Sequence, residues 1–267
     1  MNKYLHIAKI SFQEELVYKL NFLIMRLRNV LQIFLIFFLW DSVFSDPERV
    51  VFGYNRAKML TYVLGLLLIR SLVLSAKVSE IFGEVSQGGL TNYLLKPLDY
   101  FKYWIARDFA FKGINILFAF LELTVLYLIL KPTFYVQTNI LTIIFFLISV
   151  IFAIAILFIF YFIAGSIPFW FPEAAWAINF LFMFVIVEFL SGSLFPLDIL
   201  PITLQNVLSY TPFPYLIFFP LQIYLGNIAI VEIIKGFMVA GIWLIILKIL
   251  MNNLWKKGLK VYGAYGH

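Results

Sequence analysis

The 267-residue sequence contains no cysteine, and only 13% of its residues are charged. The lack of cysteine excludes disulfides, thiolate catalysis and cysteine-based metal sites. The two histidines, His6 and His267, stand at opposite ends of the chain, which leaves no histidine-based metal centre. Soluble domains are about 25% charged, so this chain has too few charged groups to cover a water-facing surface. It is therefore not expected to be an ordinary soluble protein.

Motifs that carry catalysis are missing as well. The sequence has no G-x-x-x-x-G-K-[ST] phosphate loop, no H-E-x-x-H and no G-x-S-x-G. We therefore expect no catalytic residue, no metal site and no cofactor bound by this chain, which by itself is not expected to be an enzyme. If nucleotide energy is used, another chain must bind the nucleotide.

Apolar residues dominate what is present, at 63% of the chain. A helix that crosses a membrane needs about 20 mostly apolar residues. Six stretches meet this requirement: Phe22–Phe44, Ala57–Ala76, Phe109–Leu130, Ile140–Gly165, Ala174–Ser193 and Ile230–Met251. The sequence predicts an all-α integral membrane protein in which residues 1–267 form one domain with six transmembrane helices.

The distribution of basic residues predicts the orientation of these helices. With the N-terminus inside, the inner connections hold Lys3, Lys9, Lys19, Lys77, Lys96, Lys102, Arg107, Lys256, Lys257 and Lys260, and the outer ones hold Arg49, Arg56, Lys58 and Lys131. Basic residues accumulate in cytoplasmic loops, so both termini, including the tail 252–267, are expected in the cytoplasm. The net charge of +6 then reflects topology, and no nucleic acid is expected as a partner.

Residues 1–19 precede the first span and have an amphipathic pattern. Leu5, Ala8, Phe12 and Leu16 recur at spacings of three and four, with polar residues between them. This spacing predicts a short helix with one apolar stripe. We expect it to lie at the membrane interface, a position that also permits contact with a cytoplasmic partner.

The connection at 77–107, between the second and third spans, contains a second amphipathic segment. Gly88 and Gly89 allow a sharp turn. Leu90, Tyr93 and Leu94 then form one apolar helical turn, which Pro97 ends. A short helix of this kind is suited to docking into a groove on a soluble partner, and the alternative is a helix that lies at the interface.

Prolines cluster between the fifth and sixth spans, in residues 194–227. Pro196, Pro201, Pro212, Pro214 and Pro220 fall within 25 positions. Proline breaks helices, and broken backbone at membrane depth requires protein or a water-filled cavity around it. We predict re-entrant half-helices that dip into the outer leaflet. The alternative is an apolar loop that rests on the bilayer.

Few charges lie within the spans, and each of them is a candidate functional residue because its burial costs about 2.5–3.5 kcal/mol. They are Arg70, Glu122 and Glu188. We expect Arg70 to form an ion pair with Glu122. The pair either holds two helices together or has a role in coupling transport to its energy source. Arg26 and Arg28 stand near the start of the first span and are expected to reach the inner headgroups as anchors.

Three groups of residues resemble the permease subunits of ABC-2-type transporters, in particular an uncharacterised six-span subgroup, and the resemblance covers essentially the whole chain. The first is Gly89 with Tyr93 to Pro97, and the second is Ser191 to Leu197 with Pro201. The third, in the basic tail, comprises Trp255, Gly258, Leu259, Tyr262 and Gly266.

The resemblance implies a half-transporter for export in a bacterial plasma membrane. Two permeases, identical or different, would stand in the bilayer above two ATP-binding subunits, which would hold ATP and Mg. Residues 84–97 would form the coupling helix, and the N-terminal helix would also face the ATPase. The residues implied in coupling are Glu84, Gly89, Leu90, Tyr93, Leu94, Lys96 and Pro97. Those implied in an outer gate are Phe195, Pro196, Pro201, Pro212 and Pro214.

The substrate class is suggested by composition. The chain has 31 phenylalanines, 15 tyrosines and 6 tryptophans and few charges within its spans. These features favour an apolar or amphipathic substrate, such as a lipid, a drug or a hydrophobic peptide. A secondary transporter that needs no ATPase, and a membrane scaffold that transports nothing, are the alternatives.

Overall fold

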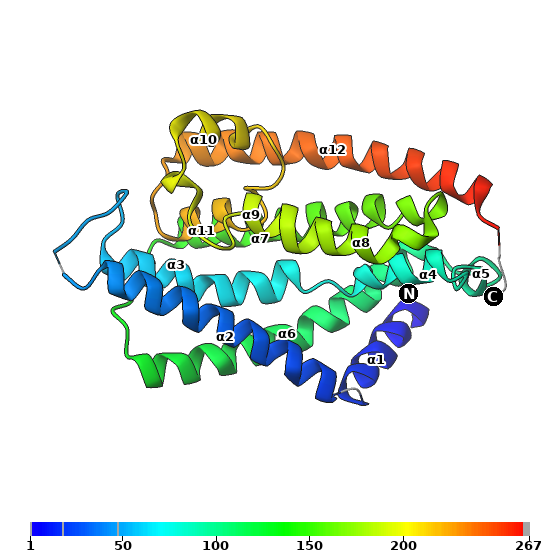
Figure 1. Ribbon diagram of the computed structural model, residues 1–267, viewed down its shortest axis with the longest axis horizontal. Coiled ribbons are helices and arrows are strands. Elements are labelled where there is room, and N and C mark those ends of the chain that lie inside the picture. Colours follow the sequence, from blue (N-terminus) through cyan, green and yellow to red (C-terminus); the bar gives the residue numbers. More distant parts are fainter. Residues whose placement is uncertain (1, 18, 47, 264–267) are drawn as a thin grey trace.

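The computed structural model describes residues 2–17, 19–46 and 48–263 (Figure 1). The α-helices are α1 (Asn2–Val17), α2 (Lys19–Val43), α3 (Arg56–Ile69), α4 (Ile81–Ser86), α5 (Thr91–Leu94), α6 (Tyr100–Leu130), α7 (Ile140–Ala164), α8 (Ala175–Phe180), α9 (Glu188–Leu190), α10 (Ile202–Ser209), α11 (Phe218–Tyr224) and α12 (Ile230–Val261). Short 3₁₀ segments are η2 (Lys77–Glu80), η3 (Ile167–Phe169), η4 (Pro172–Ala174) and η6 (Leu197–Ile199), and η1 (Arg70–Leu74) and η5 (Leu181–Val187) are π-helical.

Six helical segments within the described residues are long and apolar enough to cross a membrane. They are Phe22–Val43, Arg56–Leu74, Tyr100–Leu130, Ile140–Phe169, Pro172–Leu190 and Ile230–Val261. The described part of the chain forms no strand, and its one β-bridge joins Val51 and Tyr54. The predicted class, an all-α membrane protein with six spans, is confirmed.

The third span begins earlier than predicted. Asp99 caps α6 by accepting a hydrogen bond from the backbone N–H of Lys102 at 3.0 Å, which is a strong helix start. Trp104 in the first turns is fully buried, so packing extends the helix beyond its apolar stretch. The predicted connection 77–107 therefore ends at Asp99, and residues 100–107 belong to the span.

The second and fifth spans are irregular in their middle or final turns. The α-helical hydrogen-bond pattern widens to a π-helix at η1, which follows α3, and at η5, between α8 and α9. Such bulges are rare and are frequently found at functional sites. Each includes or adjoins a charged residue: buried Arg70 at the start of η1, and largely buried Glu188 immediately after η5.

The bundle is built around α3, most of whose side chains are buried from Met59 to Ile69. The long helices run side by side (Figure 1), with α12 packed on α7, α2 on α3, and α11 on α7. We call the end that holds α1, residues 77–99 and the last turns of α12 the loop end. The opposite end, with residues 44–55 and α10, is the far end.

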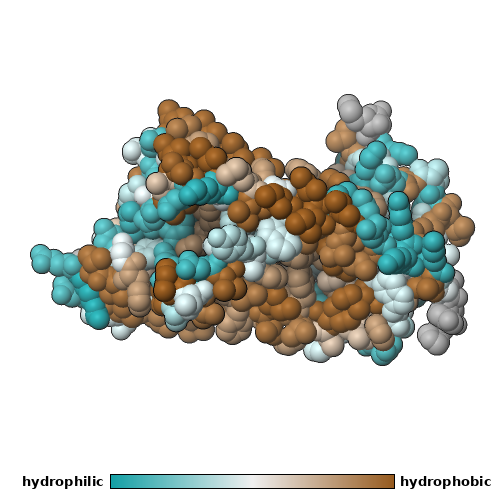
Figure 2. Space-filling model, turned by 90° about the horizontal axis from the view of Figure 1, so that it is seen from above, coloured by the Kyte–Doolittle hydropathy of each residue, from teal (hydrophilic) through white to brown (hydrophobic). Residues whose placement is uncertain are grey.

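The surface has the pattern that a bilayer requires. Figure 2 shows hydrophobic residues over most of the middle of one face, with hydrophilic residues gathered toward the two ends. Exposed apolar side chains include Leu27, Leu31 and Leu35 of α2, which in water would be unfavourable. Helices suit this setting because they satisfy their backbone hydrogen bonds internally.

The first helix packs along α6, but its apolar stripe does not face the bundle. Ser11 is buried, whereas Leu5 and Phe12 are exposed. The side chain of Leu16 lies outside the described residues. An interfacial position for α1 stays a prediction.

Candidate functional site

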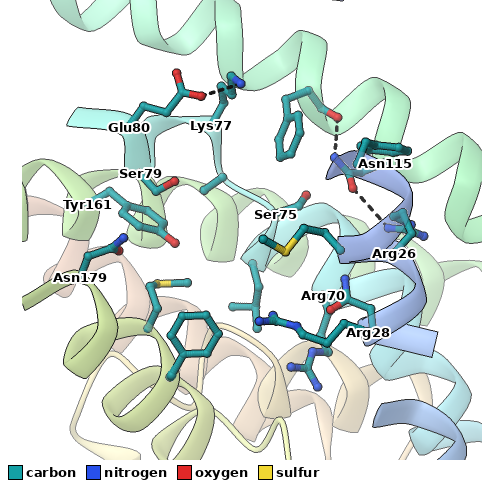
Figure 3. Close-up of a pocket in the computed structure, with 18 of the residues that line it drawn as sticks. Arg26, Arg28, Arg70, Ser75, Lys77, Ser79, Glu80, Asn115, Tyr161 and Asn179 are labelled. Atoms are coloured by element: carbon teal, nitrogen blue, oxygen red, sulfur yellow. Dashed lines mark hydrogen bonds and ion pairs between the residues drawn. The ribbon is translucent and has the colours of Figure 1, made fainter. Parts of the chain in front are cut away.

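A cavity of about 560 Å³ lies between α2, the segment η1–η2, α6, α7 and η5 (Figure 3). Its apolar lining comprises Phe22, Met25, Leu74, Phe111, Met183 and Phe184. Its charged lining comprises Glu15, Arg26, Arg28, Arg70, Lys77, Glu80 and Glu188. A volume of this order is typical of small-molecule sites, and the combination of apolar walls with charged groups suits an amphipathic ligand.

Arg26 forms the first of two buried ion pairs beside this cavity. Its Nε lies 2.7 Å from Oε1 of Glu122, and its second terminal nitrogen binds Oε2 of the same carboxylate. Its Nη1 donates to Ser71 Oγ at 2.9 Å and to Asn115 Oδ1 at 3.2 Å. The prediction that Arg26 anchors at the headgroups is wrong, because the planar guanidinium is held inward by a two-point contact with Glu122.

Arg70 forms the second pair, with Glu188 rather than with Glu122. The guanidinium also donates to Gln32 Oε1 at 3.0 Å. The predicted Arg70–Glu122 pair is wrong because Glu122 is already neutralised by Arg26 and because η1 presents Arg70 to α2 and α9. The two pairs tie η1 to α2, α6 and α9, so they fix how four of the spans pack.

Arg28 also lines the cavity. Its side chain is exposed, and its guanidinium carbon lies 5.0 Å from the centre of the Phe184 ring. Figure 3 places Arg28 and Arg70 on the same side of the pocket and Tyr161 and Asn179 across from them. Its predicted role as a headgroup anchor stays a prediction.

A network of charges closes the cavity toward the loop end. Lys77 Nζ lies 2.6 Å from both Glu15 Oε1 and Glu80 Oε1, which joins α1 to η2. Burial opposes the charge of Lys77, but the two carboxylates outweigh it and raise the pKa of its ammonium group. Below this network, Lys112 binds Asp108 at 3.0 Å and the Ser75 carbonyl at 2.6 Å.

The segment 81–97 is a small folded unit at the loop end. Gly88 has a φ of +78°, which glycine adopts without strain, and the turn that it makes precedes α5. The predicted helical turn is present, but only part of its apolar face is buried. Leu90 is buried and Tyr93 is half-buried, whereas Leu94 is 50% exposed and its neighbour Leu95 is 82% exposed.

Lys96 and Pro97 follow on the same exposed stretch. We call residues 94–97 the exposed tip. Lys3 Nζ donates to the Pro97 carbonyl at 3.0 Å, so α1 lies against the tip. Gly89 packs against the backbone of Glu84, whose Oε2 accepts a hydrogen bond from the Tyr100 hydroxyl at 2.5 Å.

Aromatic rings connect this tip to two spans. We define the aromatic cluster as Tyr93, Tyr100, Tyr103, Trp104, Phe162 and Trp255. Trp255 of α12 stacks on Tyr100 of α6, with ring centres 5.3 Å apart. The Tyr262 hydroxyl lies 3.3 Å from Oγ1 of Thr91 in α5. Of the tail residues singled out in the sequence, Trp255 thus packs in the aromatic cluster and Tyr262 contacts α5. Gly266 lies outside the described residues.

Gly258 explains the close approach of α12 to the turn after α7. A Cβ at this position would overlap ring atoms of Phe169. Leu259 packs against the core beside it. The absence of a side chain at position 258 therefore lets the last turns of α12 lie on η3.

At the far end, residues 194–227 form short helices separated by prolines. Pro196 and Pro201 immediately precede η6 and α10, and Pro212 and Pro214 are buried ahead of α11. Phe195 packs at the edge of the core. The segment contains the two short helices α10 and α11, and their predicted re-entry into the outer leaflet stays a prediction.

Hydrogen bonds hold this outer segment to α3 and to the turn that precedes it. The Tyr54 hydroxyl and Gln222 Nε2 both donate to Asp198 Oδ2 at 2.8 Å. Burial raises the pKa of Asp198, and these hydrogen bonds partly offset that rise. Lys58 Nζ of α3 donates to Asn227 Oδ1 at 2.6 Å, and the Tyr62 hydroxyl donates at 2.6 Å to the carbonyl of Gly192, just before the segment.

Sequence reasoning missed several of these partners, although one signal was present. Asp108, Asn115 and Glu122 are seven residues apart along α6. Seven residues are about two helical turns, so all three lie on one face. This polar stripe would have identified the face of α6 that turns toward the cavity and toward Arg26.

The chain was compared with known proteins. The family model described as "ABC-2 family transporter protein" matches residues 30–266, a range that begins within α2. No curated protein matches the chain.

Proposed function

Because the chain belongs to the ABC-2 family of transporter proteins, we propose that it is half of an ATP-driven exporter whose ATP-binding subunits are separate chains. As a multi-pass membrane protein of this family it is a permease, a transport subunit rather than a catalytic one. ATP and Mg bind to the partner subunits, two copies of which stand beneath two permeases, identical or different.

The exposed tip is the observation that carries this proposal. Leu94 and Leu95 project from a short, well-packed unit at the loop end, beside Lys96 and Pro97. Apolar side chains on such a protrusion are suited to a groove on another protein. The loop end then faces the cytoplasm, in agreement with its basic residues, and α1 lies close enough to meet the same partner.

Force applied to the tip has a direct route into the bundle. Tyr93 contacts Tyr100 and Tyr103 at the start of α6, and Tyr100 stacks on Trp255 of α12. Rigid aromatic packing of this kind transmits displacement because protein interiors are close-packed. Closure of the ATP-binding subunits moves α5 and, with it, the inner ends of two long spans.

The cavity is the proposed substrate site. It combines apolar walls with charged groups, which supports an apolar or amphipathic substrate that enters from the membrane. The open side of α2, with Leu27, Leu31 and Leu35 exposed, faces the second permease across the substrate path. The proline-separated segment 194–227 is the outer gate, through which the substrate leaves.

Co-purification tests the coupling role. The chain is expressed with the ATP-binding protein encoded beside its gene, and the double variant Leu94→Ala, Leu95→Ala is compared with wild type. We expect loss of most of the bound partner, because alanines leave its groove unfilled. Leu128→Ala near the end of α6, also an exposed leucine, is the matched control away from the tip. Full retention of the partner and of coupled ATP hydrolysis by the double variant would contradict the assignment.

A further inference from the structure

The arginines beside the cavity differ in whether the chain neutralises them. Arg26 is paired with Glu122, and Arg70 with Glu188. Among the residues that the structure describes, Arg28 has no acidic partner. Its contact with the face of Phe184 uses none of its N–H donors, so all of them remain available to a ligand.

Arg70 adds a second available donor on the same side of the cavity. Its side chain is only 6% exposed, and its Nη1 has no hydrogen-bond partner among the described residues. Buried donors in folded proteins are nearly always satisfied. Figure 3 shows Arg70 beside Arg28, with Lys77 and Glu80 in a separate part of the pocket. Glu188 Oε2 likewise has no hydrogen-bond partner among the described residues, but its carboxylate is paired with Arg70 through Oε1. The half of the cavity at Arg28, Arg70 and Glu188 therefore carries one net positive charge.

The apolar walls of the cavity, by contrast, favour an apolar part of a ligand. Phe22, Met25, Leu74, Met183 and Phe184 line the same cavity, and Met25 and Phe184 are also exposed at the molecular surface. Thioether and aromatic side chains adapt to flexible apolar chains. A ligand that satisfies both regions has an anionic group and an apolar tail.

We propose that this cavity binds amphipathic anions, with a phosphate or carboxylate held by Arg28 and Arg70 and an alkyl chain against the phenylalanine and methionine wall. This inference rests on the proposed transport function and narrows its substrate class. An amphipathic cation would place a second positive charge beside Arg28. An uncharged amphiphile accepts hydrogen bonds from these donors but leaves the positive charge of Arg28 without a counter-charge.

Binding of radiolabelled dodecyl phosphate to the full chain in phosphatidylcholine nanodiscs tests the proposal, with empty discs subtracted. Unlabelled dodecyl phosphate is expected to compete at least about tenfold better than dodecyltrimethylammonium, which has the same tail. If phosphatidate in the disc also displaces the radiolabelled dodecyl phosphate, the natural ligand is an anionic bilayer lipid. If only unlabelled dodecyl phosphate displaces it, the natural ligand is a single-chain amphiphile. Either result supports the site. Equal competition by the anion and the cation overturns it.

Variants locate the site. Arg28→Glu and Arg28→Gln are each expected to weaken dodecyl phosphate binding at least about tenfold, whereas Arg28→Lys keeps the charge but loses the planar group of N–H donors and is expected to weaken it less than Arg28→Gln does. Arg49→Glu is the matched control, because it reverses an exposed arginine at the far end. Retention of wild-type affinity by both Arg28→Glu and Arg28→Gln overturns the proposal.

Recruitment of the ATP-binding subunit is measured on the same proteins. A chain that prefers the anion but recruits no subunit refutes the ATP-driven permease and leaves the anion site standing. A chain that recruits the subunit but shows no preference refutes the anion site alone.

Discussion

At the scale of single residues, the buried ion pairs determine how the spans can be arranged. A charge within the bilayer is unfavourable unless a partner meets it. Arg26 and Glu122 meet through two hydrogen bonds, and Ser71 and Asn115 take a further donor of the same guanidinium. Removing one partner of a buried ion pair destabilises a protein more than replacing both partners by apolar residues, because the remaining charge stays buried without a partner.

Glu122→Ala is therefore expected to destabilise the protein by about 3–5 kcal/mol, since Arg26 remains buried without a carboxylate. Glu122→Gln retains a hydrogen-bond acceptor and should lose less. Unfolding in detergent, followed by circular dichroism, measures both. Glu48→Ala is the control, because Glu48 is exposed in the loop after α2. Equal stability of the Glu122→Ala and Glu48→Ala variants would show that the pair does not hold the spans together.

Glu84 predicts a pH dependence of the tip. Burial raises the pKa of its carboxyl above the ordinary value of 4.5, and hydrogen bonds from Tyr100 and Tyr93 offset only part of the rise. A raised pKa means that the folded state binds the proton more tightly than the unfolded state. The contribution of the Glu84 carboxyl to the free energy of unfolding is thus greatest below pH 4.5, and it is lost as the pH rises through the folded-state pKa.

Glu84→Gln removes this titration. Relative to wild type, the variant should gain stability as the pH increases, and the difference should level off above the folded-state pKa. Melting temperatures across the acidic range measure it, with Glu173→Gln at an exposed position as the control. A constant difference between wild type and Glu84→Gln across the range would refute the raised pKa.

At the scale of elements, packing at the loop end depends on the close approach of α12 to η3. Gly258 permits this approach because a Cβ there would overlap Phe169. Phe169 in turn contacts Trp255 edge-on, with ring centres 5.1 Å apart. The last turns of α12 are consequently held in contact with α6 and α5.

Gly258→Ala is expected to destabilise the protein by about 1–3 kcal/mol, because the added methyl group overpacks the contact with Phe169. The matched control is Gly113→Ala on α6, where a Cβ would meet nothing within 4 Å. Alanine there should stabilise the helix by about 1 kcal/mol. Thermal unfolding of the two variants gives opposite signs if the packing is as described.

Elements were predictable from the sequence where one strong signal decides them. The apolar run from Ile140 has no competing pattern, and α7 begins at that residue. The start of α6 was missed because the charged residues Lys102 and Arg107 suggested a loop. The helix includes them because Asp99 caps its first turn and Trp104 is buried. Charge partners were missed because Arg26, Arg70, Glu122 and Glu188 allow several pairings, and only the packing of the spans selects among them.

At the scale of the whole molecule, the two ends of the bundle have different constructions. The loop end carries the exposed tip on a rigid aromatic base, and the cavity lies between it and the far end. The far end holds its proline-separated helices through hydrogen bonds that Tyr54 and Gln222 donate to Asp198 and that Lys58 donates to Asn227. A contact surface at one end and short helices joined by hydrogen bonds at the other are the two features on which the proposed function rests.

The most direct test of this account uses the absence of cysteine from the chain. Leu95→Cys places a single thiol on the exposed tip, and Val50→Cys places one in the exposed loop at the far end. Each is labelled with a membrane-impermeant maleimide, in intact and in permeabilised cells, with and without the co-expressed ATP-binding subunit. The account predicts that the thiol at position 95 reacts only after permeabilisation and is protected by the subunit, whereas the thiol at position 50 reacts in intact cells and is not protected. Labelling at position 95 in intact cells, or labelling there that the subunit does not reduce, would contradict it.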